Sequence, residues 1–419
     1  MTTTTNNEQK KLNFSSEREQ SQACLNSAEH EKNQGRKVLN VPNLRFPEFQ
    51  GEWEKCKVSD LLDFYSTNSL SWDKLEYGTD AIQNLHYGLI HVGLSTMIDL
   101  SKDKLPNITN GNTPKNYELC QEGDIAFADA SEDTNEVAKA VEFYKLKGKD
   151  VICGLHTIHG RDNLQKTVVG YKGYVFSSTA FHHQIRRIAQ GTKIYSINSK
   201  NFSECYIGIP SEEEQKKIAT LLRLIDERIV TQNKIIDKLQ SLIKGIAQKI
   251  VHSNKPNVCL SECLECKTST LQESDVCEHG VYPVYGANGI VGYLDNYNTE
   301  GEAVYIIKDG SGVGTVSYVT GKCSATGTLN TLQAKEGYSL QYLYYLLKVF
   351  NFEPYKTGMA IPHIYFKDYG KAKVFCPSYT EQLRYARLLS AIDNKLSIEQ
   401  NILTELRLQK QYLLCQMFI

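Results

Sequence analysis

The sequence lacks the features of a membrane protein or of a strongly charged binder. Its longest apolar runs, such as residues 342–347, are far shorter than the roughly 20 residues that span a bilayer. Lysine and arginine total 47 against 48 acidic residues, and the net charge of -1 excludes a histone-like or polybasic protein. The first 40 residues contain no apolar signal core. We therefore expect a cytoplasmic protein, without membrane contact, whose 12 cysteines are reduced.

Motifs of common catalytic sites are also missing. No G-x-S-x-G, H-E-x-x-H or P-loop sequence is present, nor the N-P-P-[FY] or D-P-P-Y motif of methyltransferases. His156, His159, His182 and His183 therefore have no motif that would support a hydrolase. We expect no catalytic residue, no metal and no cofactor in this chain.

Two segments resemble ligand sites but fit them poorly. The glycine-rich residues 309–314 run into a strand pattern, whereas a dinucleotide fingerprint must open a helix. They predict a glycine hairpin, either a tight turn or a loop whose amides face a phosphate. Cys259, Cys263, Cys266 and the pair Cys277 and His279 do not have a standard zinc spacing. Residues 258–264 also match residues 58–62, which predicts that Cys263 is a core residue.

An internal repeat is the strongest feature of the sequence. Residues 191–250 align without a gap on residues 358–417, and 15 of the 60 positions are identical. A period of this length indicates a duplicated domain rather than a solenoid. Each copy has a variable globular part followed by a long helix.

Both helix starts carry strong signals. Pro210-Ser211 with Glu214, and Pro377-Ser378 with Glu381, place a capping serine before a glutamate at the third helical position. Apolar residues then recur at spacings of four and three, as in a coiled coil. Each helix should measure about 60 Å. The expected seam comprises Ile218, Leu222, Ile225, Ile229, Gln232, Ile236 and Leu239 in the first copy, and Leu389, Ile392, Leu396, Glu399, Leu403 and Leu406 in the second.

The two helices are predicted to pair with each other, because neither can bury such a stripe alone. A core helix inside a single domain is the alternative. In an antiparallel pair, the polar seam residues Gln232 and Glu399 would meet and fix the register.

The predicted fold is α+β, with two β-rich domains alternating with two long antiparallel helices. Residues 1–41 form a disordered extension, 42–210 the first domain, 211–253 the first helix, 254–376 the second domain and 377–419 the second helix. Short strands are expected in the first domain at residues 87–92, 124–128, 137–144, 167–169, 174–176 and 185–188. The second domain should hold strands at 281–285, 291–293, 303–307 and 315–319 and a helix at 339–350.

Candidate DNA contacts are polar or basic residues in strands and turns. Residues 181–187 alternate like a strand, and one face would present Arg, which reads guanine, or Gln, which suits adenine. Surface salt bridges are the alternative for the same side chains. The candidates are Lys172, His182, Gln184, Arg186 and Arg187 in the first domain, and Lys308, Ser311, Gly312, Lys322 and Asn330 in the second.

The duplicated pattern resembles a known family. Three features resemble the specificity subunit of type I restriction–modification systems. They are Trp53 near the start of the first domain, the segment Gly191-x2-Ile194-x2-Ile197 before the first helix, and the boundary motif P-S-x2-E-Q-x3-A-x-L-L-x2-I-D. The resemblance covers about residues 42–419. It implies that each domain recognises half of a bipartite, non-palindromic site in double-stranded DNA, while the helices set the half-site spacing.

The resemblance also implies partners. The helices would dock two adenine-methylating subunits, and the complex would recruit ATP-dependent restriction subunits. S-adenosylmethionine, ATP and magnesium would then be used by those partners. Residues 41–210 hold 18 basic and 21 acidic residues, which predicts weak DNA binding by the chain alone.

Two other interpretations remain. The chain could be a duplicated ligand-binding or scaffold protein that does not contact DNA. It could also be a zinc-dependent enzyme that uses the Cys259–His279 cluster.

Overall fold

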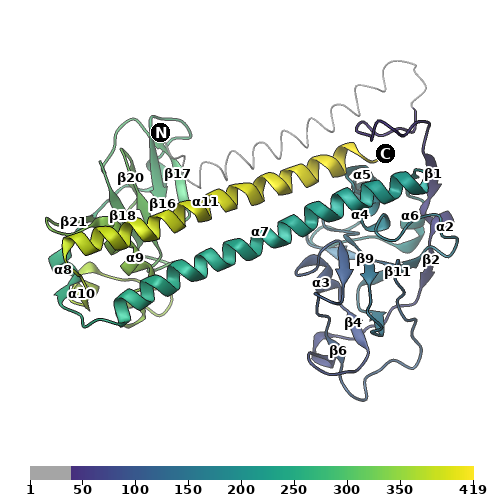
Figure 1. The fold of residues 1–419 in the computed structure, drawn as a ribbon, viewed down its shortest axis with the longest axis horizontal. Helices are drawn as coiled ribbons and strands as arrows, with labels where there is room; N and C mark the ends of the chain where they lie inside the picture. Colours follow the sequence, from purple (N-terminus) through teal and green to yellow (C-terminus); the bar gives the residue numbers. More distant parts are fainter. Residues whose placement is uncertain (1–38) are drawn as a thin grey trace. The chain divides into compact units, whose positions relative to one another are not determined.

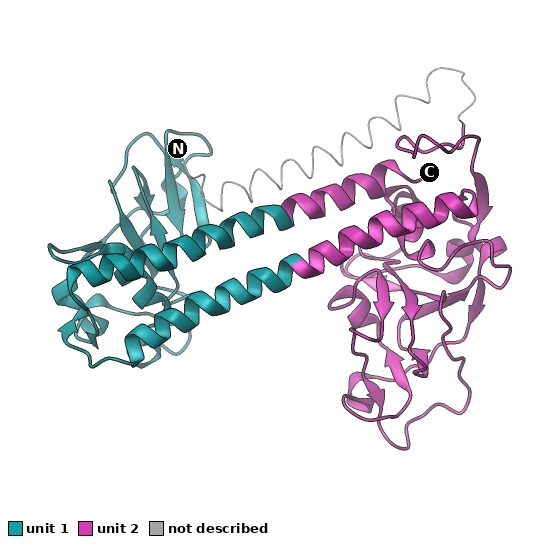
Figure 2. Cartoon of the chain, in the orientation of Figure 1, with its two compact units in different colours: residues 1–20, 232–403 teal, residues 21–231, 404–419 magenta. Residues whose placement is uncertain are grey.

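The computed structural model describes residues 39–419, so the predicted disordered extension, residues 1–41, lies almost wholly outside the described part. The chain divides into two compact units (Figure 2), each of which contains one globular domain and half of each long helix. Unit 2 includes residues 39–231 and 404–419, and unit 1 includes residues 232–403. No helix within residues 39–419 combines the length and apolar character needed to cross a bilayer.

The two long helices are α7, Glu212–His252, and α11, Tyr379–Gln416 (Figure 1). Their starts use the same residues differently. The Ser378 backbone N–H and hydroxyl both donate to the Glu381 carboxylate at the start of α11, at 3.2 and 2.6 Å. At the start of α7, Glu214 instead accepts two hydrogen bonds from Arg45, each of 2.7 Å. In the second copy the glutamate side chain thus caps the serine N–H. In the first copy the Ser211 hydroxyl accepts from the Glu214 backbone N–H at 3.4 Å, and the Glu214 carboxylate joins the first domain to its helix.

In unit 2, the halves of α7 and α11 run antiparallel. Ile218, Leu222 and Ile225 belong to the same apolar cluster as Leu413 and Met417, so early residues of α7 meet late residues of α11. Lys410, which interrupts the apolar seam of α11, pairs with Asp226 of α7 at 2.6 Å. That ion pair explains why a charge is tolerated at a seam position.

In unit 1, the polar seam residues meet. Gln232 Nε2 donates to the backbone carbonyl of Glu399 at 2.9 Å and also to its carboxylate. Hydrogen bonds from Lys395 and from Gln232 lower the pKa of Glu399, so the carboxylate is charged at neutral pH. Gln232 and Glu399 are equivalent positions of the repeat, and the contact expected between them in an antiparallel pair is present. All thirteen expected seam residues are buried or half-buried.

The first domain contains two main sheets. A two-stranded ribbon also pairs β1, Glu54–Lys57, with β13, Tyr206–Ile209, just before α7. The five-stranded sheet has the order β2-β11-β7-β9-β5, with bounds Asp63–Tyr65, Thr157–Arg161, Ile125–Ala128, Ala140–Lys145 and Met97–Asp99. The four-stranded sheet has the order β10-β4-β6-β3, with bounds Val151–Cys153, Gln83–Leu85, Asn107–Ile108 and Leu75–Glu76. The helices are α2 Val58–Leu61, α3 Tyr87–His91, α4 Lys172–Phe176, α5 Thr179–Ile188 and α6 Ser199–Ser203.

The second domain repeats this plan in a smaller form. Its ribbon pairs β14, Val258–Cys259, with β22, Lys373–Val374. The main sheet has the order β15-β21-β18-β19, with bounds Leu264–Thr268, Leu329–Ala334, Ala303–Ile307 and Val316–Val319. A three-stranded sheet has the order β17-β16-β20, with bounds Gly289–Leu294, Tyr282–Gly286 and Ser324–Ala325. The helices are α8 Leu260–Cys263, α9 Leu340–Val349 and α10 Phe366–Tyr369.

The structure assigns several first-domain segments differently from the sequence pattern. Residues 124–128 and 137–144 contain the expected strands, but 87–92, 174–176 and 185–188 contain helix, and 167–169 contain neither. In α5, the side chain of Ser178 accepts a hydrogen bond from the Phe181 backbone N–H and starts a helix that buries Phe181 and Ile185. The prediction of a strand there was wrong because the two buried residues lie four positions apart, as on one face of a helix, rather than at alternate positions. All the elements expected in the second domain are present.

Candidate nucleic-acid interface

The same side chains connect each domain to its long helix. Gln215 of α7 donates to the Pro210 carbonyl at 3.0 Å and accepts from the Val168 backbone N–H at 2.9 Å. Gln382 of α11, its equivalent, bonds the Pro377 carbonyl at 2.9 Å and the Ser339 N–H at 2.9 Å. Both glutamines are buried. A buried amide with both ends satisfied fixes the position of the domain on its own helix.

Two tyrosines repeat the same attachment. The Tyr171 hydroxyl donates to the Gly208 carbonyl, and the Tyr342 hydroxyl donates to the Phe375 carbonyl, each at 2.7 Å. One turn further on, Tyr174 bonds Asp226 at 3.0 Å and Tyr345 bonds Asp393 at 3.3 Å. The equivalence therefore extends upstream of Gly191, to a part of the chain in which the sequence repeat is not visible.

Each domain also presents an equivalent exposed hairpin. Residues 190 and 196 form an antiparallel bridge in the first domain, as do residues 357 and 363 in the second. Gly191 and Gly358 open the two turns with φ of 138° and 88°, and a Cβ on either would collide with the carbonyl of the residue three positions later. This collision explains why glycine occupies both positions. Ile194 and Ile361 at the tips are 61% and 58% exposed.

In the second domain, the glycine-rich loop lies beside this hairpin. Asp309 forms an isolated β-bridge with His363, and its carboxylate accepts from the His363 ring Nδ1 at 2.6 Å. The Gly310 N–H donates to the Pro362 carbonyl at 3.0 Å. Ser311 is exposed, and Lys308 and Gly312 are half-exposed. Three candidates from the sequence therefore share one edge with the repeated hairpin.

In the first domain, α5 leads into the hairpin. Arg186 and Arg187 in its last turn are exposed, and Arg186 donates to the Asn135 side chain at 2.9 Å. Burial, assisted by the charge of Arg186, lowers the pKa of His182 to about 4, so this ring is neutral at pH 7. Gln184 bonds both backbone groups of Tyr206, at 2.8 and 2.9 Å. The two arginines are thus the accessible candidates here.

The remaining candidates lie elsewhere. Lys322 is exposed and stands 4.8 Å above the Tyr297 ring. Asn330 is buried and donates to the Tyr369 hydroxyl at 3.3 Å. Lys172 is buried 3.3 Å from the Glu142 carboxylate. Neither Asn330 nor Lys172 has a side chain that a duplex could reach in this structure, so neither belongs to the candidate interface.

Replacing Lys172 with methionine is expected to destabilise the protein by about 3 kcal/mol, because it leaves a buried carboxylate without its cation. Burial raises the pKa of Glu142 even though Lys172 and the backbone amides of Gly170 and Gly173 oppose the rise. Denaturant unfolding measures the effect. Lys147→Met, at an exposed turn, is the matched control and should change stability little. Unchanged stability in Lys172→Met together with weaker DNA binding would instead favour the contact expected from sequence.

The cysteines suspected of binding zinc do not gather around one point. Cys263 is a fully buried core residue, as expected, with its sulfur 3.8 Å from that of Cys376, whereas Cys277 is exposed. Within residues 39–419, the one group with three potential ligand atoms close together is Cys120, Cys153 and His159. These three residues have no short spacing in the sequence that would mark them as a metal site.

The two domains share one arrangement of sheets, and equivalent glutamine and tyrosine side chains attach each domain to a long helix. The protein is therefore a duplication of one unit that consists of a domain and a helix. The model of the type I restriction modification DNA specificity domain matches residues 103–241 and again residues 253–408. The chain therefore belongs to this family, and the resemblance inferred from the sequence is confirmed.

Relatives and solved structures agree with this assignment. A putative type I specificity subunit of Mycoplasma genitalium is 25% identical over 66% of this chain and 78% of its own length. A type I specificity subunit of Escherichia coli is 28% identical, but the match spans only 28% of this chain and 29% of that protein. The crystal structure of an M. genitalium type I S subunit has the same fold, with a TM-score of 0.60 at 17% identity over 90% of this chain and 99% of that chain.

Proposed function

We propose that this chain is the sequence-specific DNA-binding subunit of a type I restriction–modification complex. Each globular domain reads one half of a bipartite, non-palindromic site, and the paired helices set the spacing between the halves. Catalysis belongs to partner subunits, which use S-adenosylmethionine, ATP and magnesium. The proposal rests on membership of the DNA specificity family together with the duplicated plan.

The observation that carries the half-site proposal is that the two domains share one scaffold but have different accessible side chains beside the hairpin. The glutamine and tyrosine anchors and the glycine hairpin recur in both domains. The accessible chemistry beside the hairpin differs, with Arg186 and Arg187 in one domain and Lys308, Ser311 and Gly312 in the other. Because the scaffold is the same, both domains would present side chains to DNA from equivalent positions. Because those side chains differ, the two domains would prefer different bases.

The long helices also carry features expected of a docking surface for two adenine-methylating subunits. Several large apolar side chains on them are exposed and lie outside the seam. They are Leu224, Val230, Ile235 and Leu242 on α7 and Leu388, Ile398, Ile402 and Tyr412 on α11. Apolar groups that water covers in the single chain are suited to burial against a partner. The same complex would recruit restriction subunits.

Co-expression with an adenine methyltransferase subunit of the same system, followed by methylome sequencing of the host, tests the proposal. One bipartite sequence with an adenine in each half should become methylated only when both chains are present, because the target base must be flipped into the pocket of the partner. Methylation that does not depend on this chain would overturn the proposal.

Binding measurements supply the control. With near-balanced charge, the chain alone should bind its site weakly at about 150 mM salt, and adding the methyltransferase should increase the affinity sharply. Tight specific binding by the lone chain would contradict the expectation that partner subunits supply much of the contact with DNA phosphates. A duplicated scaffold that does not bind DNA predicts no sequence preference in either measurement.

A further inference from the structure

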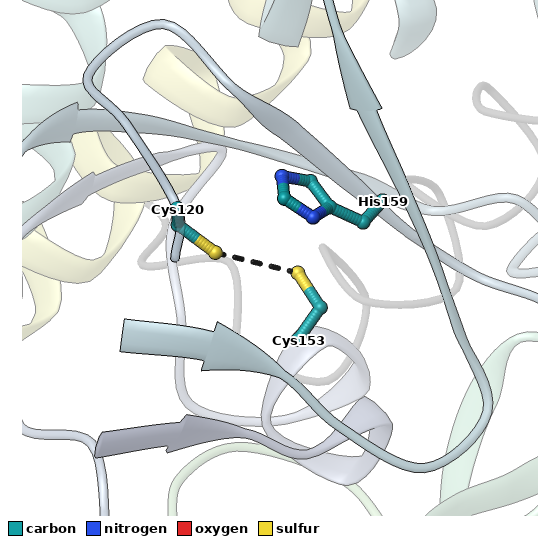
Figure 3. A group of neighbouring side chains, drawn as sticks. All are labelled: Cys120, Cys153 and His159. Carbon is teal, nitrogen blue, oxygen red and sulfur yellow. Dashed lines mark hydrogen bonds between the residues drawn. The ribbon is translucent and has the colours of Figure 1, made fainter. Parts of the chain in front are cut away.

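A buried cluster of two thiols and one imidazole lies in the first domain (Figure 3). Cys120 precedes β7, Cys153 ends β10 of the four-stranded sheet, and His159 lies in β11 of the five-stranded sheet. The three residues are 5%, 2% and 0% exposed. They therefore bring together three chain segments, including strands from both sheets, at one dry point.

The spacing of the ligand atoms is close to what a tetrahedral ion requires. The two sulfurs are 3.6 Å apart. Two zinc–sulfur bonds of about 2.3 Å at a tetrahedral angle place the sulfurs about 3.8 Å apart. The ligand atoms of all three residues lie within 4.8 Å of one another. Loading would therefore need a side-chain adjustment on the order of 1 Å, and no rearrangement of the sheets.

The histidine is already oriented for ligation. Its Nε2 bonds the buried Asp124 carboxylate at 2.7 Å, and Arg161 holds that carboxylate with two hydrogen bonds of 2.8 Å. A histidine ligand typically donates its second ring nitrogen to a carboxylate in this way. The other nitrogen, Nδ1, is buried and has no hydrogen-bond partner. A buried ring nitrogen without a partner is rare in proteins and requires an explanation.

We propose that Cys120, Cys153 and His159 bind one zinc ion, which links the two sheets of the first domain. Two thiolates and a neutral imidazole are typical ligands of this soft divalent ion. Binding releases two thiol protons to solvent, and the two thiolates then balance the charge of the ion. The three side chains would fill three of the four positions of a tetrahedral ion, and one water entering with the ion would fill the fourth. Because the cluster is buried away from bulk solvent, the role of the ion is structural. The inference does not depend on DNA recognition.

The second domain supplies a matched control. Cys263 and Cys376 also place two buried sulfurs near each other, 3.8 Å apart. No group of three potential ligands includes them among the residues that the structure describes. If any close pair of thiols were enough, both domains would bind zinc.

The test uses the full chain, purified under reducing conditions and freed of metal with a chelator. Titration with zinc should give about one equivalent per chain, and cobalt should give thiolate charge-transfer absorption. Cys120→Ala and Cys153→Ala should lose both signals, whereas Cys376→Ala should retain them. Absence of stoichiometric uptake by the wild-type chain, or uptake that persists in both variants of the first domain, would overturn the proposal.

A measurement on the unaltered protein covers variants that fail to fold. Zinc should protect Cys120 and Cys153, but not Cys376, from alkylation during partial unfolding, as read by peptide mass mapping. It should also raise the unfolding midpoint of the wild-type chain, because the ion binds only the folded state. Equal alkylation with and without zinc, or a Cys120–Cys153 disulfide that forms while no zinc is taken up, would refute the site.

Discussion

Inserting one heptad into each long helix, after Gln232 and after Glu399, is expected to widen the gap between the half-sites by about 3 base pairs. Seven residues add about 10 Å of helix, and DNA rises about 3.4 Å per base pair. A heptad keeps the apolar stripe facing the partner helix, whereas four residues would rotate it. Both helices must be lengthened because Gln232 and Glu399 contact each other across the seam.

Methylome sequencing reads the result directly. Methylation at the original spacing should disappear, while the two half-sequences reappear at the longer spacing. A control chain with the same seven residues in the exposed turn at Gly148 should keep the original site. New half-sequences, or an unchanged gap in the lengthened chain, would contradict the proposed spacer role.

Exchanging residues 42–210 for the corresponding domain of another family member is expected to change one half-site only. Each mismatched base pair costs about 1–3 kcal/mol, so loss of about three specified pairs should weaken recognition of the original site by roughly 10²-fold or more. The untouched second domain should still require its own half-sequence.

The structure shows what the incoming domain must retain. It needs an arginine at position 45 for the Glu214 carboxylate, whose side chain is 1% exposed. It also needs the tyrosines at 171 and 174, which bond Gly208 and Asp226. A chimaera lacking Arg45 is the matched control, and it should fold less stably because the buried carboxylate loses its cation. A graft that retains all three residues and changes both half-sites would contradict modular reading.

The candidate interface was only partly predictable. Arg186 and Arg187 were identified for their guanidinium groups, and they are exposed, but on a helix rather than on the expected strand. Lys172 and Asn330 look the same in sequence as any surface residue, yet they are buried beside Glu142 and Tyr369. A charged residue reveals its burial only when its partner, distant in the sequence, is placed next to it.

The cysteine cluster shows the same limit. Metal motifs in sequence depend on short spacings, and Cys259, Cys263 and Cys266 attracted attention for that reason. The group that converges is Cys120, Cys153 and His159, which have no recognisable spacing. Sheet pairing brings them together, and its signal in sequence is weak because contacts between strands are long-range.

The sequence alone determined the duplication, the two long helices, their seam and the family. These features follow from local periodicity and capping, or from direct self-comparison, so no tertiary information is needed. The tertiary structure decided which side chains of the first domain are accessible and which short segments are helical. It also revealed the equivalence of the tyrosine anchors, which is hidden in the sequence. Burial and pairing arise from packing between distant segments, and packing can override local propensity wherever an element is only one or two turns long.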